Sequence, residues 1–127
     1  MSINHPNVKI LRAIYKDLSC IDIYVDDDVV LHTADREIPG HVAKIIGKNA
    51  VLAKELELIE LTQNTLVMDV QSIIANDHFG AVLGVLRMFI KGSHHEMPFC
   101  GLWRFRNGRI VEHWENAYDP TVLGNFF

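Results

Sequence analysis

The residues best suited to chemistry lie near the end of the chain, in the stretch FCGLWRFRNGRIVEHWENAYD from Phe99 to Asp119. Here the ionisable side chains of Glu112, His113 and Glu115 are interleaved with aromatic and aliphatic ones. A carboxyl group in an apolar pocket has a raised pKa, which brings it close to the pH at which it works as a base. A histidine or arginine that faces it can donate a hydrogen bond to a developing oxyanion. The composition of this stretch therefore favours proton transfer.

The same stretch indicates two antiparallel strands joined by a two-residue turn at Asn107-Gly108. Asn-Gly favours such a hairpin because a type I′ turn needs a positive φ at both central positions. Counting outward from the turn pairs Arg106 with Arg109 and predicts which side chains share a face. The first expected face holds Phe99, Gly101, Trp103, Phe105, Ile110, Glu112 and Trp114. The second expected face holds Cys100, Leu102, Arg104, Arg106, Arg109, Val111, His113 and Glu115.

Both expected faces mix ionisable and apolar side chains, whereas a hairpin built only for packing would keep its polar residues on one side. A lined cavity explains the mixture, and so does a sheet whose two faces contact a core and a partner subunit. The register decides which side chains lie on which face, because a slip of one residue would exchange the two faces entirely.

Two helices are expected in the first half of the chain. The first spans residues 5–18, with Pro6 in its first turn and an apolar stripe at helical spacing that includes or adjoins Tyr15. Tyr15 is expected either as a core aromatic with its hydroxyl at the rim or as part of a pocket wall. The second helix runs from residue 48 or 49 to residue 62. The residues that it presents on or near one side are Val51, Leu52, Glu55 and Ile59.

The rest of the chain has the pattern of strands and loops. The expected strands before the hairpin cover residues 29–33, 43–46, 65–75 and 80–91. His32 lies inside the first of them, either packed and hydrogen-bonded or functional. The aspartates 26–28 and the segment 92–98 are expected to be loops, without the ligand spacing of a metal site. Helices beside a run of strands, without βαβ alternation, predict an α+β fold in which helices and a curved, mostly antiparallel sheet enclose an interior pocket.

Length and composition exclude several classes of function. A chain of 127 residues is one domain, 1–127, and its 49% hydrophobic and 22% charged residues are typical of a soluble globular protein. A formal charge of −4 without a lysine or arginine cluster argues against nucleic acid as a partner. No stretch approaches the roughly 20 apolar residues that span a bilayer, so no membrane is expected. Without a signal-peptide pattern, and with Cys20 and Cys100 at no motif spacing, a cytoplasmic setting is expected.

The segment WRFRNGRIVEHWEN resembles the closing hairpin of SnoaL-like proteins, in the nuclear transport factor 2-like (NTF2-like) superfamily. Members commonly show an aromatic-Arg-Phe, a charged-Asn/Asp-Gly turn, and then Ile-Val-Glu-His-Trp followed by an acidic residue. The segment VVLHT at 29–33 is similar to the family's first strand. The resemblance implies a conical α+β barrel, commonly a homodimer, with a pocket between helices and sheet. It does not imply one activity, because the superfamily includes polyketide cyclases, ketosteroid isomerase and members that only bind ligands.

The resemblance also implies roles for individual residues. In SnoaL-like proteins an acidic side chain near the end of the last strand is the usual general base, and both Glu115 and Asp119 are candidates for it. His32 is then expected as the electrophilic donor, and His113 or Arg104 as the residue that orients the carboxylate. Aromatic side chains are expected to shape the pocket and bind substrate, namely Tyr15 with Trp103 or Trp114.

Two functions from different classes stay open. The first is a cofactor-free enzyme that performs general acid–base chemistry (cyclisation, isomerisation or dehydration) on a small apolar carbonyl compound. Because the chain has no nucleotide-binding loop, nucleophile triad or metal signature, neither a cofactor nor a metal is expected. The second is a non-catalytic module that binds an apolar ligand or mediates dimerisation. The carboxylates discriminate between them, because catalysis needs an acid or base inside the cavity.

Overall fold

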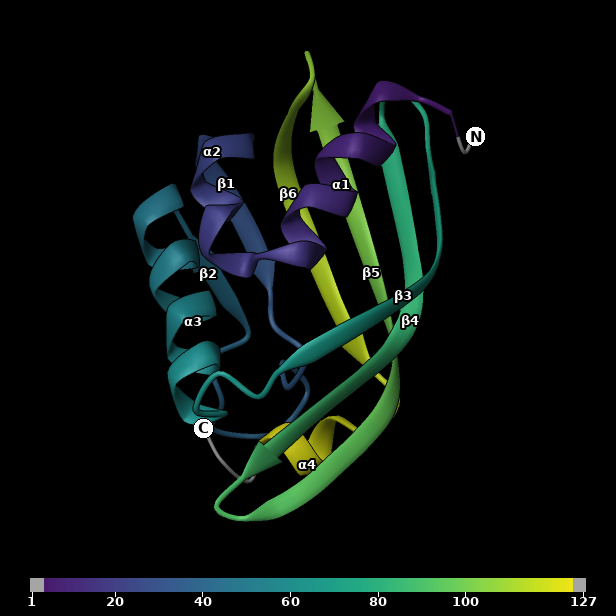
Figure 1. Ribbon diagram of the computed structural model, residues 1–127. Helices are drawn as coiled ribbons and strands as arrows, with labels where there is room; N and C mark the ends of the chain where they lie inside the picture. Colours follow the sequence, from purple (N-terminus) through teal and green to yellow (C-terminus); the bar gives the residue numbers. More distant parts are fainter. Residues whose placement is uncertain (1–3, 125–127) are drawn as a thin grey trace.

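The computed structural model describes residues 4–124 and shows helices packed on one face of a six-stranded sheet (Figure 1). Its elements in chain order are α1 (Pro6–Lys16), the 3₁₀-helix η1 (Leu18–Cys20), α2 (Ile21–Tyr24), β1 (Val25–His32), β2 (Lys44–Ile46), α3 (Lys48–Leu61), β3 (Val67–Ala75), β4 (Phe79–Ile90), β5 (Ser93–Arg106), β6 (Arg109–Ala117) and α4 (Pro120–Gly124). The strands lie in the order β2-β1-β6-β5-β4-β3. Neighbouring strands are antiparallel except β1 and β6, which are parallel. The predicted α+β fold with a mostly antiparallel sheet is confirmed.

Helix α1 forms where the sequence combines a capping residue, a proline and an apolar stripe. Pro6 occupies the first helical turn, where its missing N–H has no partner to lose. The ring Nδ1 of His5 caps the helix by accepting a hydrogen bond from the backbone N–H of Asn7 at 3.1 Å. The buried residues of the helix recur at helical spacing: Asn7, Val8, Leu11, Ile14 and Tyr15. The stripe packs α1 against the sheet, with Tyr15 stacked on Phe99 of β5.

Two tight turns set the long hairpins. The β5–β6 turn at Asn107-Gly108 has φ angles of 53° and 77°, which confirms the predicted two-residue turn. The β4–β5 turn at Lys91-Gly92 is similar, with φ angles of 51° and 80°. Because this second turn is so short, β5 begins at Ser93 and the segment 93–98 pairs with β4. The predicted loop over 92–98 is therefore wrong.

The aspartates 26–28 lie on β1 rather than in the predicted loop. The strand accommodates them because their carboxylates reach the surface, where cations from neighbouring elements are available. Asp27 lies 3.0 Å from the ammonium of Lys48, and Asp26 lies 3.2 Å from the guanidinium of Arg106. Such exposed ion pairs contribute little to stability, but they offset part of the repulsion between the adjacent carboxylates.

The β5–β6 register shifts by one residue close to the turn. Phe105 pairs with Ile110, but the preceding residue of β5, Arg104, pairs with Glu112, so Val111 is an extra residue on β6. This β-bulge sends every later side chain of β6 to the opposite face from the one expected. The predicted faces are therefore wrong beyond the bulge.

Beyond the bulge, Trp103 pairs with His113 and Gly101 pairs with Glu115. Both Trp103 and His113 are buried and face the helices. The β6 side chains whose predicted face is exchanged are Glu112, His113, Trp114 and Glu115. A histidine and a carboxyl group thus reach the interior together with the tryptophan of β5.

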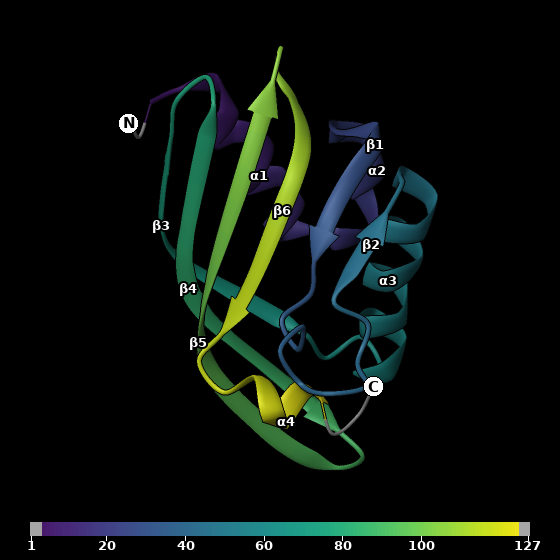
Figure 2. The same ribbon diagram turned by 180° about the vertical axis from the view of Figure 1, so that it is seen from behind.

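Helices α1, α2 and α3 lie on one face of the sheet (Figure 1), and the view from behind shows β4, β5 and β6 in front of α1 (Figure 2). Helix α1 packs on β3 and β4, and α3 packs on β1. The largest fully buried side chains come from both layers: Trp103, Leu11, Ile14, Ile21, Leu31 and Met88. In the part of the chain that the structure describes, no helix is both long enough and apolar enough to cross a membrane.

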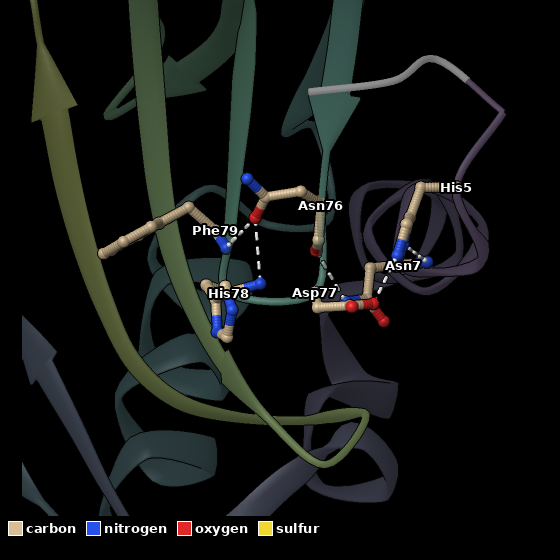
Figure 3. Close-up of polar contacts among 6 residues, drawn as sticks. All are labelled: His5, Asn7, Asn76, Asp77, His78 and Phe79. Atoms are coloured by element: carbon tan, nitrogen blue, oxygen red, sulfur yellow. Dashed lines mark hydrogen bonds and ion pairs between the residues drawn. The ribbon is translucent and has the colours of Figure 1, made fainter.

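A polar clasp joins the start of α1 to the β3–β4 turn (Figure 3). Asn7 is only 4% exposed, and its Nδ2 donates to the backbone oxygen of Asn76 at 3.0 Å. His5 Nε2 lies 2.8 Å from Asp77 Oδ1. The Asn76 side-chain oxygen accepts hydrogen bonds from the backbone N–H groups of residues 78 and 79, at 2.8 and 2.7 Å. The clasp orders the turn and holds the first helix over the sheet.

Replacing Asn7 with alanine should lower the free energy of unfolding by about 1–2 kcal/mol, because the half-buried carbonyl of Asn76 loses its donor. Urea unfolding followed by circular dichroism measures the change. Lys9→Ala, on the exposed side of the same helix, is the control and should change stability by less than about 0.5 kcal/mol. Equal effects from the two substitutions would contradict the assignment of the clasp.

Candidate functional site

A cavity of about 60 Å³ lies between the helices and the inner face of the sheet. Most of its wall is apolar, with side chains from α3, β3, β4 and β5 that include Leu58, Met68, Met88 and Phe99. The polar groups that interrupt this wall come from α1, α3, β5 and β6 and include Tyr15, Glu55, Trp103, His113, Glu115 and Asn116. A few polar groups converging in an apolar hollow are typical of a small-molecule site.

The hydroxyl of Tyr15 is held in place by the indole of Trp103. Trp103 Nε1 donates to Tyr15 Oη at 3.2 Å, and the two rings meet edge to face at 81°. Gly101 permits this approach, because a Cβ atom at position 101 would overlap the tyrosine hydroxyl. Burial raises the pKa of Tyr15 despite the hydrogen bond from Trp103, so the phenol stays protonated and available as a donor.

His113 is neutral in the folded protein. Burial lowers the pKa of its imidazole to about 3, against a hydrogen bond to the Leu102 carbonyl. Because a carbonyl only accepts, His113 Nδ1 carries the proton in this 3.0 Å contact, and Nε2 keeps a lone pair. The ring also stacks on Trp103 with centroids 3.4 Å apart. His113 therefore brings an acceptor and no positive charge to the cavity.

Glu115 is positioned by a network that runs across the ends of β5 and β6. Arg36 Nη1 donates to the backbone oxygen of Glu115 at 2.5 Å, and Arg36 Nη2 donates to Asn116 Oδ1 at 2.7 Å. Asn116 Nδ2 in turn donates to the backbone oxygen of Cys100 at 3.1 Å. These bonds fix the backbone of β6 where the Glu115 side chain enters the cavity.

Burial raises the pKa of the Glu115 carboxyl to about 7. The ammonium of Lys54, a hydrogen bond from the backbone of Ala34 and the guanidinium of Arg36 act in the opposite direction, and the carboxylate of Asp35 adds to the rise. A carboxyl group with this pKa exchanges its proton near neutral pH, as a general base must.

Glu55 is a second carboxyl group in the same cavity, and sequence reasoning gave it no role. It projects from α3, is 3% exposed and lines the cavity together with Glu115. Burial and the neighbouring Glu115 raise its pKa well above the usual range. The sequence held a signal for it, because Glu55 follows Val51 by four residues, on the helix side expected to be buried.

Three residues expected in the pocket lie on the outer face of the sheet. The bulge places Trp114 of β6 there, and His32 of β1 and Arg104 of β5 lie on the same face. Glu112 Oε2 is 2.6 Å from His32 Nε2, and Glu112 Oε1 is 3.0 Å from the guanidinium of Arg104. The ring of Trp114 stacks on His32 with centroids 5.1 Å apart. The placement of His32, Arg104 and Trp114 in the pocket is thus wrong.

Asp119 also lies away from the cavity. Its carboxylate caps the start of α4 by accepting from the backbone N–H of Thr121 at 3.2 Å and from the Thr121 hydroxyl at 2.5 Å. The side chain is exposed. Of the two acids considered as the base, the structure brings only Glu115 to the cavity, where it joins His113, Tyr15 and Trp103.

Within residues 4–124, no three histidine, cysteine, aspartate or glutamate side chains converge as metal ligands would. The cavity itself supplies acids and a hydrogen-bond donor. It offers a carboxyl group that exchanges protons near neutral pH, a second carboxyl group that holds its proton more tightly, and a protonated phenol. Such a set can remove a proton and stabilise the oxyanion that results.

Comparison with protein families matches a SnoaL-like domain model to residues 14–113 of the chain. A search of curated proteins gives no match. Solved structures agree in fold: Bal32a, from a soil-derived mobile gene cassette, is 20% identical with a TM-score of 0.78, covering 94% of this chain and 95% of its own.

Two further structures are similar to this chain. IdmH from Streptomyces antibioticus, described as a candidate polyketide cyclase, is 21% identical with a TM-score of 0.72, covering 94% of this chain and 97% of its own. A protein with a ketosteroid isomerase-like fold from Catenulispora acidiphila, solved with trimethylamine, is 13% identical with a TM-score of 0.70, covering 87% of this chain and 83% of its own. At these identities the likeness shows the fold alone, and it confirms the expected NTF2-like fold.

Replacing Glu115 with glutamine should stabilise the protein increasingly as the pH rises. The folded protein keeps the Glu115 proton up to a pKa of about 7, whereas an unfolded chain loses it near the ordinary value of 4.5. The folded state therefore binds more protons between these values, and the contribution of Glu115 to the free energy of unfolding falls across that window. Relative to wild type, Glu115→Gln should gain up to about 3 kcal/mol between pH 5 and pH 8.

Urea unfolding at several pH values measures this difference. His113 acts with the opposite sign, because its pKa of about 3 lies below the ordinary value of 6.5 and its contribution to stability is lost as the pH falls through that range. Both proteins share this effect, so it largely cancels in the comparison. Glu57→Gln, at an exposed position of α3, is the matched control for the change from glutamate to glutamine. A constant offset for Glu115→Gln would contradict the placement of its carboxyl group.

Proposed function

The chain belongs to the SnoaL-like domain family, and from that premise we propose that it is a cofactor-free enzyme acting by proton transfer on a small apolar carbonyl compound. One observation supports this proposal. The Glu115 carboxyl group enters an apolar cavity, with its pKa raised to about 7. A pocket with no acid or base would have favoured simple binding.

The reaction begins when the Glu115 carboxylate removes a proton from the carbon next to the carbonyl. The electron pair of that C–H bond moves onto the carbonyl oxygen and forms an enolate. The Tyr15 hydroxyl, held by Trp103, donates a hydrogen bond to this oxygen. Tyr15 thereby takes the donor role expected of His32, which lies on the other face of the sheet.

The enolate then has three outcomes, which correspond to the three expected reactions. Return of the proton from Glu115 to another carbon completes an isomerisation. Loss of a β-hydroxyl, with a proton leaving on the departing oxygen, completes a dehydration. Attack on a second carbonyl of the same molecule, followed by protonation of the new alkoxide, closes a ring. In the last two reactions the protonated Glu55 can deliver the proton to the oxygen and then take up the one that Glu115 removed, because both carboxyl groups line the same cavity.

A specific observation favours a second property, homodimerisation through the outer face of the sheet. Phe79, Leu83 and Leu102 are 46%, 52% and 42% exposed there, on β4 and β5. The charges beside them are paired within the chain, as in the contacts of Arg87 with Asp69 and Glu96. A second copy of the same face would cover these apolar side chains in a two-fold contact. We propose that the protein is a homodimer in the cytoplasm. The unbridged thiols of Cys20 and Cys100 support the proposed compartment, because the cytoplasm keeps thiols reduced.

Glu115→Gln should slow deuterium uptake at the carbon next to the carbonyl of a small ketone in D₂O. Loss of a general base should lower the exchange rate by about 10²- to 10⁴-fold, and the wild-type rate should rise with pH through about 7. Proton NMR of a panel of small enolisable ketones and β-diketones measures the exchange. Asp119→Asn is the control and should leave the rate unchanged. Exchange by wild type at the uncatalysed rate across the panel, or equal exchange by Glu115→Gln, would overturn the proposal.

Leu83→Lys should convert the proposed dimer to a monomer, because a charge would be buried in an apolar contact. Sedimentation velocity at micromolar concentration measures the mass. Leu56→Lys is the matched control, since Leu56 is 44% exposed on α3, which lies on the helical side of the molecule. A monomeric wild type, or a dimer that survives Leu83→Lys, would count against this interface.

A further inference from the structure

Glu55 has no partner that explains its burial. Its side chain is 3% exposed and lines the cavity. Among residues 4–124, none hydrogen-bonds to its carboxyl group or forms an ion pair with it; the nearby charges are Glu115, which repels it, and Lys54. A buried carboxyl group left without a hydrogen bond costs free energy, so proteins keep one where a ligand uses it.

The cavity wall holds two carboxyl groups that would ionise beside a positive charge, and among residues 4–124 it holds no cationic side chain. Glu55 and Glu115 line it, and no described lysine or arginine does. His113 adds no cation, because its ring is neutral. Lys54 and Arg36 do not line the cavity. The guanidinium of Arg36 donates hydrogen bonds to three oxygen atoms, two on β6 and one in the segment before β2. The cavity therefore favours a ligand that brings a positive charge.

The walls next to the two acids are aromatic. Tyr15 lies 5.5 Å from Phe99 and 5.9 Å from Trp103, measured between ring centroids, and all three rings line the cavity. The negative π faces of such rings attract an organic cation within about 6 Å. The sulfur atoms of Met68 and Met88 add polarisable surface. Aromatic and thioether walls suit the methyl groups of an alkylated ammonium ion better than they suit a hydrated metal ion.

We propose that the cavity binds a small alkylated ammonium ion, with its charge next to Glu55 and Glu115 and its alkyl groups against Tyr15, Phe99 and Trp103. The volume of about 60 Å³ limits the ligand to a few heavy atoms. This inference goes beyond the proposed function and needs no turnover, because such an ion has no carbonyl group.

Binding of the cation is linked to the protons of the two carboxyl groups. A bound positive charge stabilises their ionised forms, so binding releases protons from Glu55 and Glu115. The other ionisable groups near this pair are Tyr15 on α1, Lys54 on α3, Cys100 on β5, His113 on β6, and Asp35 and Arg36 before β2. The pKa of Tyr15 is raised, and those of His113 and Asp35 are lowered, so these three keep their charge states between pH 6 and pH 8. Affinity should therefore rise between pH 6 and pH 8.

The experiment compares tetramethylammonium with tert-butanol, a neutral molecule of nearly the same shape. Isothermal titration calorimetry with wild-type protein at constant ionic strength gives both affinities at pH 6 and pH 8. We expect tetramethylammonium to bind at least about tenfold more tightly than tert-butanol at pH 8, and this ratio to shrink at pH 6. Titration in two buffers of different ionisation enthalpy should show proton release for the ammonium ion only.

Glu55→Gln keeps the size of the side chain but cannot ionise when the cation binds, so it should weaken tetramethylammonium binding about tenfold or more and leave tert-butanol unchanged. Glu57→Gln, on the exposed side of α3, is the control and should bind both like wild type. Protein NMR spectra confirm that each variant is folded. Equal affinity for the two probes, or unchanged ammonium binding by folded Glu55→Gln, would overturn the inference. Loss of ketone exchange alone would not affect it, because the two assays share no reactant.

Discussion

The candidate site depends on one local feature of the backbone, the β-bulge at Val111. Side chains on a strand alternate between faces, so one extra residue decides the destination of every residue that follows it. With the bulge, His113 stacks on Trp103 and the Glu115 carboxyl group enters the cavity. Without it, Glu112 and Trp114 would point inward, and Glu112 would lose its pairing with Arg104, which lies on the outer face of β5. The tight Asn107-Gly108 turn fixes where β6 begins, and the bulge determines which side chains of β6 face the cavity.

The arrangement of elements was predictable because it depends on patterns that are local in the sequence. The Asn-Gly turn, the stripe of α1 and the absence of βαβ alternation each indicate their structure within a short window. The bulge was not predictable in this way, since Val111 carries no glycine signal and its position follows from packing between strands. The second tight turn at Lys91-Gly92 was missed for a similar reason, because a lysine with positive φ is uncommon.

Glu55 illustrates a different limit of sequence reasoning. Its place on the buried side of the helix was visible, but a glutamate there is normally a solvated residue at the edge of a stripe. Only the folded structure shows that the side chain of Glu115, on β6, lines the same cavity as Glu55. Two carboxyl groups in an apolar cavity lower the stability of the folded protein, and local conflicts of this kind are usually retained at functional sites.

The two tryptophans of the chain lie on opposite faces of one sheet. Trp103 is 1% exposed and borders the cavity, whereas Trp114 is stacked on His32 at the outer surface. Each indole therefore senses one environment and is screened from the other by the strands between them. Intrinsic fluorescence thus contains two separable optical signals, a short-wavelength emission from the interior and a longer-wavelength emission from the exterior. A molecule entering the hollow would perturb the first, and a protein covering the sheet would perturb the second.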